Sequence, residues 1–196
     1  AHKNKTTVLT TLKKTFNHQK ILVELKAPDI VPGQYADIVE DISAMINYIE
    51  RGKMSDVSEN LNALHGDMAV VEINTLKRVN LDLADNFIAK AKDIDADDYA
   101  ELSFEKADTI LQASNNFIEK NFRDRQGVKK VGLEALWAAK HAYFVALEAE
   151  KLVQMTAEES EKHILKMVSL LNRVYHEAYG KDIEPQKLYN SSESLV

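Results

Sequence analysis

The stretch VKKVGLEALWAAKHAYFVALEAEKL, residues 128–152, decides the fold. Its apolar positions follow one another in alternating steps of three and four residues, which places them on one face of a long helix. These positions are Val128, Val131, Ala135, Ala138, Ala142, Val145, Ala149 and Leu152. Half of them are alanine, so a neighbouring helix can approach more closely than leucine would allow. The stretch predicts a helix packed closely against another helix.

The rest of the chain carries further amphipathic patterns of the same period. We predict helices within residues 6–25, 34–51, 55–92, 103–118, 126–155 and 156–180. In the helix over 55–92, the apolar stripe continues through Leu76, Val79, Leu83 and Phe87. Because glycine commonly ends helices, an interruption of this helix at Gly66 stays open. The fold class that follows is all-α, an antiparallel helical bundle of five to six helices.

Turn and cap signals divide the chain between these helices. Pro28 and Pro32 mark the clearest break, because a proline disfavours helical conformation in the residue before it. Thr156 and Glu159 have the spacing of a capping box, which predicts a helix start, and Ser103 is the expected cap of the helix that follows the acidic linker 93–100. We expect one helical bundle domain over residues 1–182 and a loosely ordered tail over 183–196.

The composition restricts the function classes. The chain has 196 residues, no cysteine and a formal net charge of −6. Six lysines and one glutamate lie in residues 1–26, which leaves the rest of the chain at −11. An acidic body repels phosphate backbones, so we expect no nucleic-acid partner. Without cysteine there is no disulfide, thiolate nucleophile or cysteine-ligated metal.

The start of the chain bears on its location. It begins with Ala1, and no apolar run follows that is long enough for a signal peptide or a membrane span. We therefore expect a processed form whose targeting segment has been removed, with a membrane tether upstream of residue 1 as one arrangement. The basic leader is either a solvated helix face or a segment lying near anionic lipid headgroups.

The residues that most often carry catalysis or bind metals lack the required spacing. None of the six histidines follows a glutamate by three residues, and there is no His-Glu-x-x-His motif. A calcium loop starting at Asp93 would need glycine and glutamate where Asp98 and Phe104 stand. Glycine-rich phosphate loops and the nucleophile-elbow motif are also missing. We expect no enzyme activity, no cofactor and no metal site.

One part of the chain resembles a known family. The segment 99–107, with sequence YAELSFEKA, is followed by Asn116-Phe117-Ile118, Arg123-Asp124 and an alanine-rich helix around His141-Ala142. Across residues 91–152 this pattern resembles an uncharacterised alanine-rich helical domain of bacterial envelope lipoproteins. In that domain a Tyr-Ala-Pro turn leads into the helical hairpin, whereas this chain has Glu101 in place of the proline. The resemblance implies a helical envelope protein and supplies no catalytic residues.

These observations support two functional hypotheses. The first is a non-enzymatic binding or scaffolding module in the bacterial periplasm or attached to the outer membrane, with another envelope protein as its partner; a cytoplasmic location is the alternative. The second is a sensor or carrier that holds a small apolar ligand between its helices. The oligomeric state stays open. The candidate interaction or packing residues are Ala135, Ala138, Ala142, Ala149, Trp137 and His141.

Overall fold

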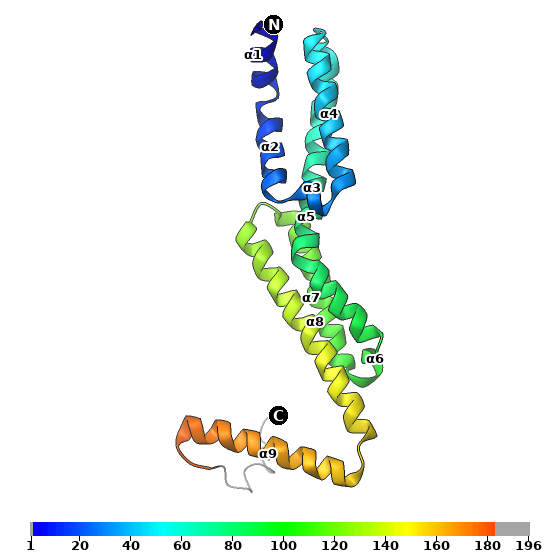
Figure 1. Cartoon of the computed structure of the whole chain (residues 1–196), viewed down its shortest axis with the longest axis vertical. Helices are drawn as coiled ribbons and strands as arrows, with labels where there is room; N and C mark the ends of the chain where they lie inside the picture. The colour runs from blue at the N-terminus through cyan, green and yellow to red at the C-terminus, as the bar shows by residue number, and fades with distance from the viewer. Residues whose placement is uncertain (1, 183–196) are drawn as a thin grey trace. The chain divides into compact units, whose positions relative to one another are not determined.

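The described part of the protein, residues 2–182 of a computed structural model, is helical throughout. Helices cover 89% of it, and these residues form no strand. They form nine helices (Figure 1): α1 His2–Thr11, α2 Lys13–Glu24, α3 Ala27–Ile30, α4 Pro32–Glu50, α5 Met54–Lys92, α6 Ala96–Tyr99, α7 Glu101–Asn121, α8 Arg125–Gln154 and α9 Ala157–Tyr179. The all-α prediction is confirmed. The number of helices exceeds five to six because α3 and α6 are single turns and a break at Leu12 separates α1 from α2.

The chain divides into two compact units, Ala1–Ala146 and Leu147–Val196, and α8 crosses the boundary between them. The division reflects where contacts within the chain are dense, and independent folding of either unit is a separate property. One bundle domain over residues 1–182 therefore stays a prediction. The tail expected over 183–196 lies outside the described residues.

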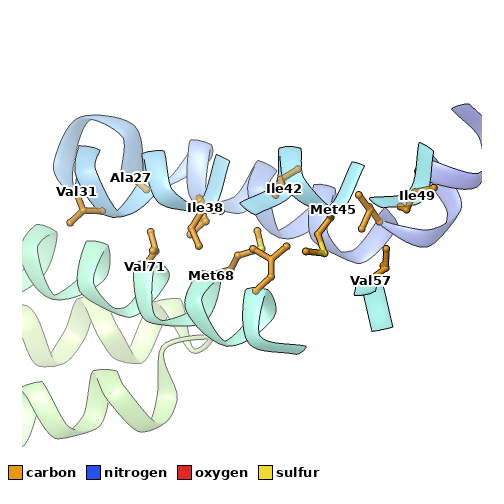
Figure 2. Close-up of a cluster of buried hydrophobic side chains, with 12 residues drawn as sticks. Ala27, Val31, Ile38, Ile42, Met45, Ile49, Val57, Met68 and Val71 are labelled. Atoms are coloured by element: carbon orange, nitrogen blue, oxygen red, sulfur yellow. The ribbon is translucent and has the colours of Figure 1, made fainter. Parts of the chain in front are cut away.

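Two large hydrophobic cores and a smaller cluster of alanines, Ala91, Ala96, Ala100 and Ala146, lie along the first unit. The first core joins α1 and α2 to α4 and to the first half of α5, and Figure 2 shows its side chains meeting between these helices. Its buried members from α4 repeat at helical spacing, as the sequence predicts. They are Ile38, Ile42, Met45 and Ile49, and they meet Val57, Leu64, Met68 and Val71 of α5.

The second core joins the other half of α5 to α7 and α8. The contribution of α8 is made almost entirely of small residues, namely Gly132, Ala135, Ala138, Ala139 and Ala142, beside Val128. The helices α5 and α8 approach closely at Gly132, where an added Cβ would lie 2.9 Å from both Cβ and the carbonyl oxygen of Asn80 in α5. On the other side, the Ser114 hydroxyl of α7 donates to the carbonyl of Val131 at 3.1 Å.

The close-packed, alanine-rich side that the sequence predicts for this helix is therefore present in α8. The buried side is centred slightly away from the eight predicted positions. Gly132, Ala139 and Ala146 are fully or nearly fully buried, whereas Val131, Val145 and Ala149 are only half-buried and Leu152 is exposed. The predicted positions form one edge of the buried stripe. The predicted line runs through Val131 and Val145 rather than through their neighbours Gly132 and Ala146, although a glycine allows the closer backbone approach.

A single long helix, α5, serves both cores, and this corrects two expectations. Gly66 does not interrupt α5, since it lies on an exposed side of the helix with no neighbouring atom within 4 Å of a Cβ placed there. Val79 and Leu83 do not continue the buried stripe and are exposed. In the second half of α5 the buried residues are Leu76, Leu81, Ala84, Ile88 and Ala91. The buried side changes because different helices cover each half of α5.

The helix ends follow local signals. Thr156 and Glu159 form the predicted capping box, in which the Thr156 hydroxyl accepts from the Glu159 amide and the Glu159 carboxylate accepts from the Thr156 amide. The helix α7 begins at Glu101 rather than after Ser103, and the acidic linker before it contains the one-turn helix α6. Asp95 enters that turn with a φ of 53°, which an aspartate tolerates better than most residues.

The second unit contains the end of α8 and the amphipathic helix α9. Within it, His163 of α9 lies 3.7 Å from a carboxylate oxygen of Glu148 in α8. No residue of α9 is buried. Seven of its large apolar side chains are between 39 and 68% exposed, and they are Ile164, Leu165, Met167, Leu170, Leu171, Val174 and Tyr179. Val168 and Tyr175 are half-buried.

Candidate interaction surface

Large apolar side chains lie exposed on α5 and α8, outside the second core. On α5, Val79 and Leu83 precede the half-buried Phe87 at steps of four residues. On α8, Leu133, Trp137 and Phe144 also share one side of the helix. Apart from Phe87, these side chains are between 58 and 65% exposed. We call the six residues Val79, Leu83, Phe87, Leu133, Trp137 and Phe144 the apolar face.

Ring contacts join the two halves of the apolar face. The ring centroid of Phe87 lies 5.8 Å from that of Tyr143 in an edge-to-face arrangement and 6.4 Å from that of Phe144. Two ammonium groups approach the Phe87 ring, Lys90 at 5.1 Å and Lys140 at 5.4 Å from its centroid. These cation–π contacts place positive charge at the rim of an aromatic cluster.

Trp137 extends this surface towards α7. Its ring stacks on that of His141, with centroids 5.0 Å apart and planes 10° apart. Both rings line an open cleft of 220 Å³ that also contains Leu102, Ser103, Lys106 and Ala138. Leu102, at the start of α7, is almost fully exposed.

The structure separates the predicted site residues into two groups. Trp137 and His141 come together at the surface, where His141 is exposed rather than packed into the core. Ala135, Ala138 and Ala142 are buried in the second core and serve packing. Ala149 is half-buried and belongs to the second unit.

A buried carboxylate links three helices within the first unit. Glu72 of α5 is 3% exposed, and its two carboxylate oxygens have different partners. One oxygen lies 2.7 Å from Nε2 of His18 in α2, and the other accepts from the guanidinium of Arg125 at the start of α8. Pairing of this kind offsets the cost of burying a charge. Through Glu72 of α5, the cluster therefore links α2, which belongs to the first core, to α8, which belongs to the second.

The surroundings of this cluster contain a second histidine. Nε2 of His65 lies 2.9 Å from the hydroxyl oxygen of the buried Thr15. Burial, with smaller contributions from His18 and Lys14, lowers the pKa of His65 below its usual value. Glu72, His18 and Arg125 also line an open cleft of 400 Å³ together with Ile21, Glu24 and Arg123. Its charged lining differs from the closed apolar cavity that a carrier of apolar ligands needs.

Within residues 2–182, no three histidine or acidic side chains are grouped so that they could hold a metal ion. Among the described helices, none combines the length and the apolar character needed to cross a bilayer.

Comparison of the chain with protein-family models, with curated proteins and with solved structures finds no match. The functional argument therefore rests on the surfaces of the chain itself.

The sequence singles out Trp137 and its neighbour His141, but not the other members of the apolar face. The helical spacing of the first half of α5, continued along the chain, predicts Val79, Leu83 and Phe87 in the core instead. One signal in the sequence indicates such a surface. Between residues 76 and 88, α5 has more large apolar residues around its circumference than one buried face requires. On α8, the same signal is the second apolar stripe opposite the alanines.

Proposed function

We propose that this chain is a non-enzymatic binding or scaffolding module that takes an amphipathic helix of a protein partner on its apolar face. The observation that carries the proposal is the pair of exposed apolar stripes, Val79, Leu83 and Phe87 on α5 and Leu133, Trp137 and Phe144 on α8, which meet at the rings of Phe87 and Phe144. Exposed apolar side chains are common singly, whereas a contiguous group of this size is typical of interaction sites.

The chemistry of the apolar face favours a helix as its occupant. Two neighbouring helices with exposed apolar side chains, at steps of four on α5 and of four and seven on α8, offer a surface for the apolar side of a further helix. Trp137 is a residue type that commonly dominates the affinity of protein interfaces. Lys90 lies beside Phe87, and Lys140 lies between Trp137 and Phe144 in the α8 stripe, so the surface favours a partner that also carries acidic residues.

The proposal places the module in the bacterial envelope, either in the periplasm or attached to the outer membrane, with another envelope protein as partner. This placement is supported by the resemblance of residues 91–152 to the helical domain of envelope lipoproteins. A tether upstream of residue 1 would hold the module at the membrane.

The arrangement of the long helices is part of the same proposal. With α1 and α2 counted as one, the long helices correspond to an antiparallel bundle of five to six helices. Short connections support this arrangement, since residues 51–53 join α4 to α5 and residues 122–124 join α7 to α8.

Site-specific photo-crosslinking in cells tests the binding function. A photoreactive amino acid replaces Leu83 in one variant, Trp137 in a second and Val70 in a control. Val70 is an equally exposed apolar residue of α5 in the first half of the helix, away from the apolar face. We expect a discrete protein adduct at positions 83 and 137 and none at 70. Equal labelling at the three positions, or none, would refute the proposal.

A further inference from the structure

The helices α1 and α2 carry a lysine-rich surface. Residues 5–26 contain five lysines and one acidic residue, Glu24, and all six side chains are exposed. The lysines are Lys5, Lys13, Lys14, Lys20 and Lys26. Among the side chains that the structure describes, only Lys20 of these five has an ion-pair partner, because its Nζ lies 3.9 Å from a carboxylate oxygen of Glu24. The surface therefore keeps a positive charge that its own neighbours do not neutralise.

Exposed apolar side chains stand among these lysines. Leu9 is 53% exposed, Val23 51% and Ile21 39%. The first core is served by other residues of the same helices, since Leu12 and Leu22 are fully buried there. The exposed apolar residues thus lie outside the core, beside charged ones. We define the basic face as Leu9, Lys13, Lys14, Lys20, Ile21 and Val23.

Apolar residues and lysines alternate along one side of α1 and α2. They succeed each other in steps of four and three residues, in the series Leu9, Lys13, Phe16, Lys20 and Val23. The helical register continues through the break at Leu12, because its amide donates to the Val8 carbonyl and its carbonyl accepts from the Phe16 amide, both at 2.9 Å. In Figure 1, α1 and α2 accordingly follow one another in line. The basic face is therefore one continuous surface.

The basic face belongs to the first unit alone. Thr15 of α2 contacts His65 in the first half of α5. The chain leaves the first unit at Ala146, which clusters with Ala91 near the other end of α5. At the rise of an α-helix, Ala91 lies about 40 Å from His65. The residues that define the basic face are thus far along α5 from the point where the second unit begins.

Acidic side chains of the same core lie on other helices. An open cleft of 340 Å³ between α4 and α5 is lined by Asp37, Asp41 and Asp67 among others. Basic and acidic side chains are therefore sorted between different helices around the first core. Such sorting lets α1 and α2 approach a negatively charged surface although the whole chain has a net charge of −6.

We propose that the basic face binds a membrane surface that contains anionic lipids. Lysines are attracted by the phosphate groups of such lipids, and apolar side chains beside them can enter the boundary between headgroups and acyl chains. A nucleic acid would offer phosphates without this apolar layer, and residues 5–26 contain no arginine, the residue type best suited to phosphate recognition in nucleic acids. The contact goes beyond the proposed binding of a partner's helix, because it uses other helices of the first unit.

Flotation of the full chain with lipid vesicles tests the contact. We expect binding to phosphatidylcholine mixed with phosphatidylglycerol to be at least roughly tenfold tighter than binding to phosphatidylcholine alone, and to weaken as salt is added. Lys13→Glu with Lys20→Glu should weaken binding to the mixed vesicles by at least roughly tenfold. Lys120→Glu with Lys129→Glu is the matched control. It changes the net charge equally at exposed positions of α7 and α8 and should leave binding nearly unchanged.

A fluorescent label measures the insertion of the apolar side chains. The chain has no cysteine, so a polarity-sensitive dye can be attached to Val23→Cys alone. Its emission should shift to shorter wavelength with the mixed vesicles, because the label leaves water. Val70→Cys is the control, since Val70 is 53% exposed and lies on α5, outside the basic face. There we expect no shift. Circular dichroism should show the same helix content in all variants, because each changed side chain is exposed.

The outcomes separate a membrane from other partners. A wild-type chain that does not float with the mixed vesicles overturns the proposal, and so do equal losses in the two lysine variants. Equal emission shifts at positions 23 and 70, or none at 23, also overturn it. If the chain ignores vesicles and binds a labelled DNA duplex through Lys13 and Lys20, the partner is a nucleic acid and the membrane contact is wrong.

Discussion

Replacing Gly132 by alanine tests the close approach of α5 and α8 with a single methyl group. The added Cβ would lie 2.9 Å from Cβ and from the carbonyl oxygen of Asn80, well inside the 3.5–4.0 Å of an ordinary contact between carbon atoms. One of these atoms belongs to the backbone, so the contact is relieved only by moving a helix. Overpacking of this kind costs about 1–3 kcal/mol.

A gain in helix propensity opposes this cost. Alanine in place of glycine inside a helix stabilises by about 1 kcal/mol, so Gly132→Ala should lower the free energy of unfolding by up to about 2 kcal/mol after this gain is subtracted from the overpacking cost. Gly66 provides the matched control, since it also lies inside a helix and its Cβ would meet nothing within 4 Å. Gly66→Ala should raise the free energy of unfolding by about 0.5–1 kcal/mol.

Urea unfolding followed by far-ultraviolet circular dichroism measures both variants. Opposite signs for the two substitutions are expected, with unchanged denaturant slopes. If Gly132→Ala stabilised the chain as much as Gly66→Ala does, the close helix contact inferred at Gly132 would be refuted.

Four further predictions concern the core, the charged cluster, pH and metals. Ala142→Leu, at a fully buried position of the second core, should cost about 1–3 kcal/mol in urea unfolding, whereas leucine at the exposed Lys129 should be nearly neutral. Arg125→Met should cost about 3 kcal/mol because it leaves the buried Glu72 with one partner, and adding Glu72→Met should recover much of the loss; additive losses would contradict this pairing. Burial lowers the pKa of His65 in the folded chain, so just below the usual histidine pKa the unfolded chain binds more protons than the folded one. The stability of the fold should therefore decrease as the pH drops through that range. Thermal unfolding at several pH values should show a weaker dependence for His65→Asn. Calcium or zinc should leave the melting temperature at its value in chelator, and a clear rise with either ion would contradict the absence of a structural metal site inferred from the spacing of the histidines and of Asp93 to Asp98.

The helices could be predicted because their signals are local. A stripe at steps of three and four in residues 34–51, or a threonine three residues before a glutamate at 156, depends only on neighbours within a few turns. The structure confirms the amphipathic helix α4 and the capping box. The short helices α3 and α6 have only four residues each, too few to show a helical period, so no pattern in the sequence predicts them.

The role of α5 could not be predicted in the same way. Which side of a helix is buried depends on where its neighbours lie, and α5 has different neighbours along its two halves. The spacing that places Met68 and Val71 in the first core therefore misplaced Val79 and Leu83. The cluster around Glu72 was also out of reach, since its partners stand 54 and 53 residues away in the sequence.

The binding of a partner's helix on the apolar face is most directly measured through Trp137, which is the one tryptophan of the chain. This residue is 65% exposed and belongs to the face itself, so its fluorescence reports on the covering of this surface. When the protein that crosslinks at positions 83 and 137 is added, we predict a shift of the emission to shorter wavelength and weaker quenching by acrylamide, both absent in Leu83→Ser. An emission that stays that of a solvent-exposed tryptophan while that protein binds would contradict the account.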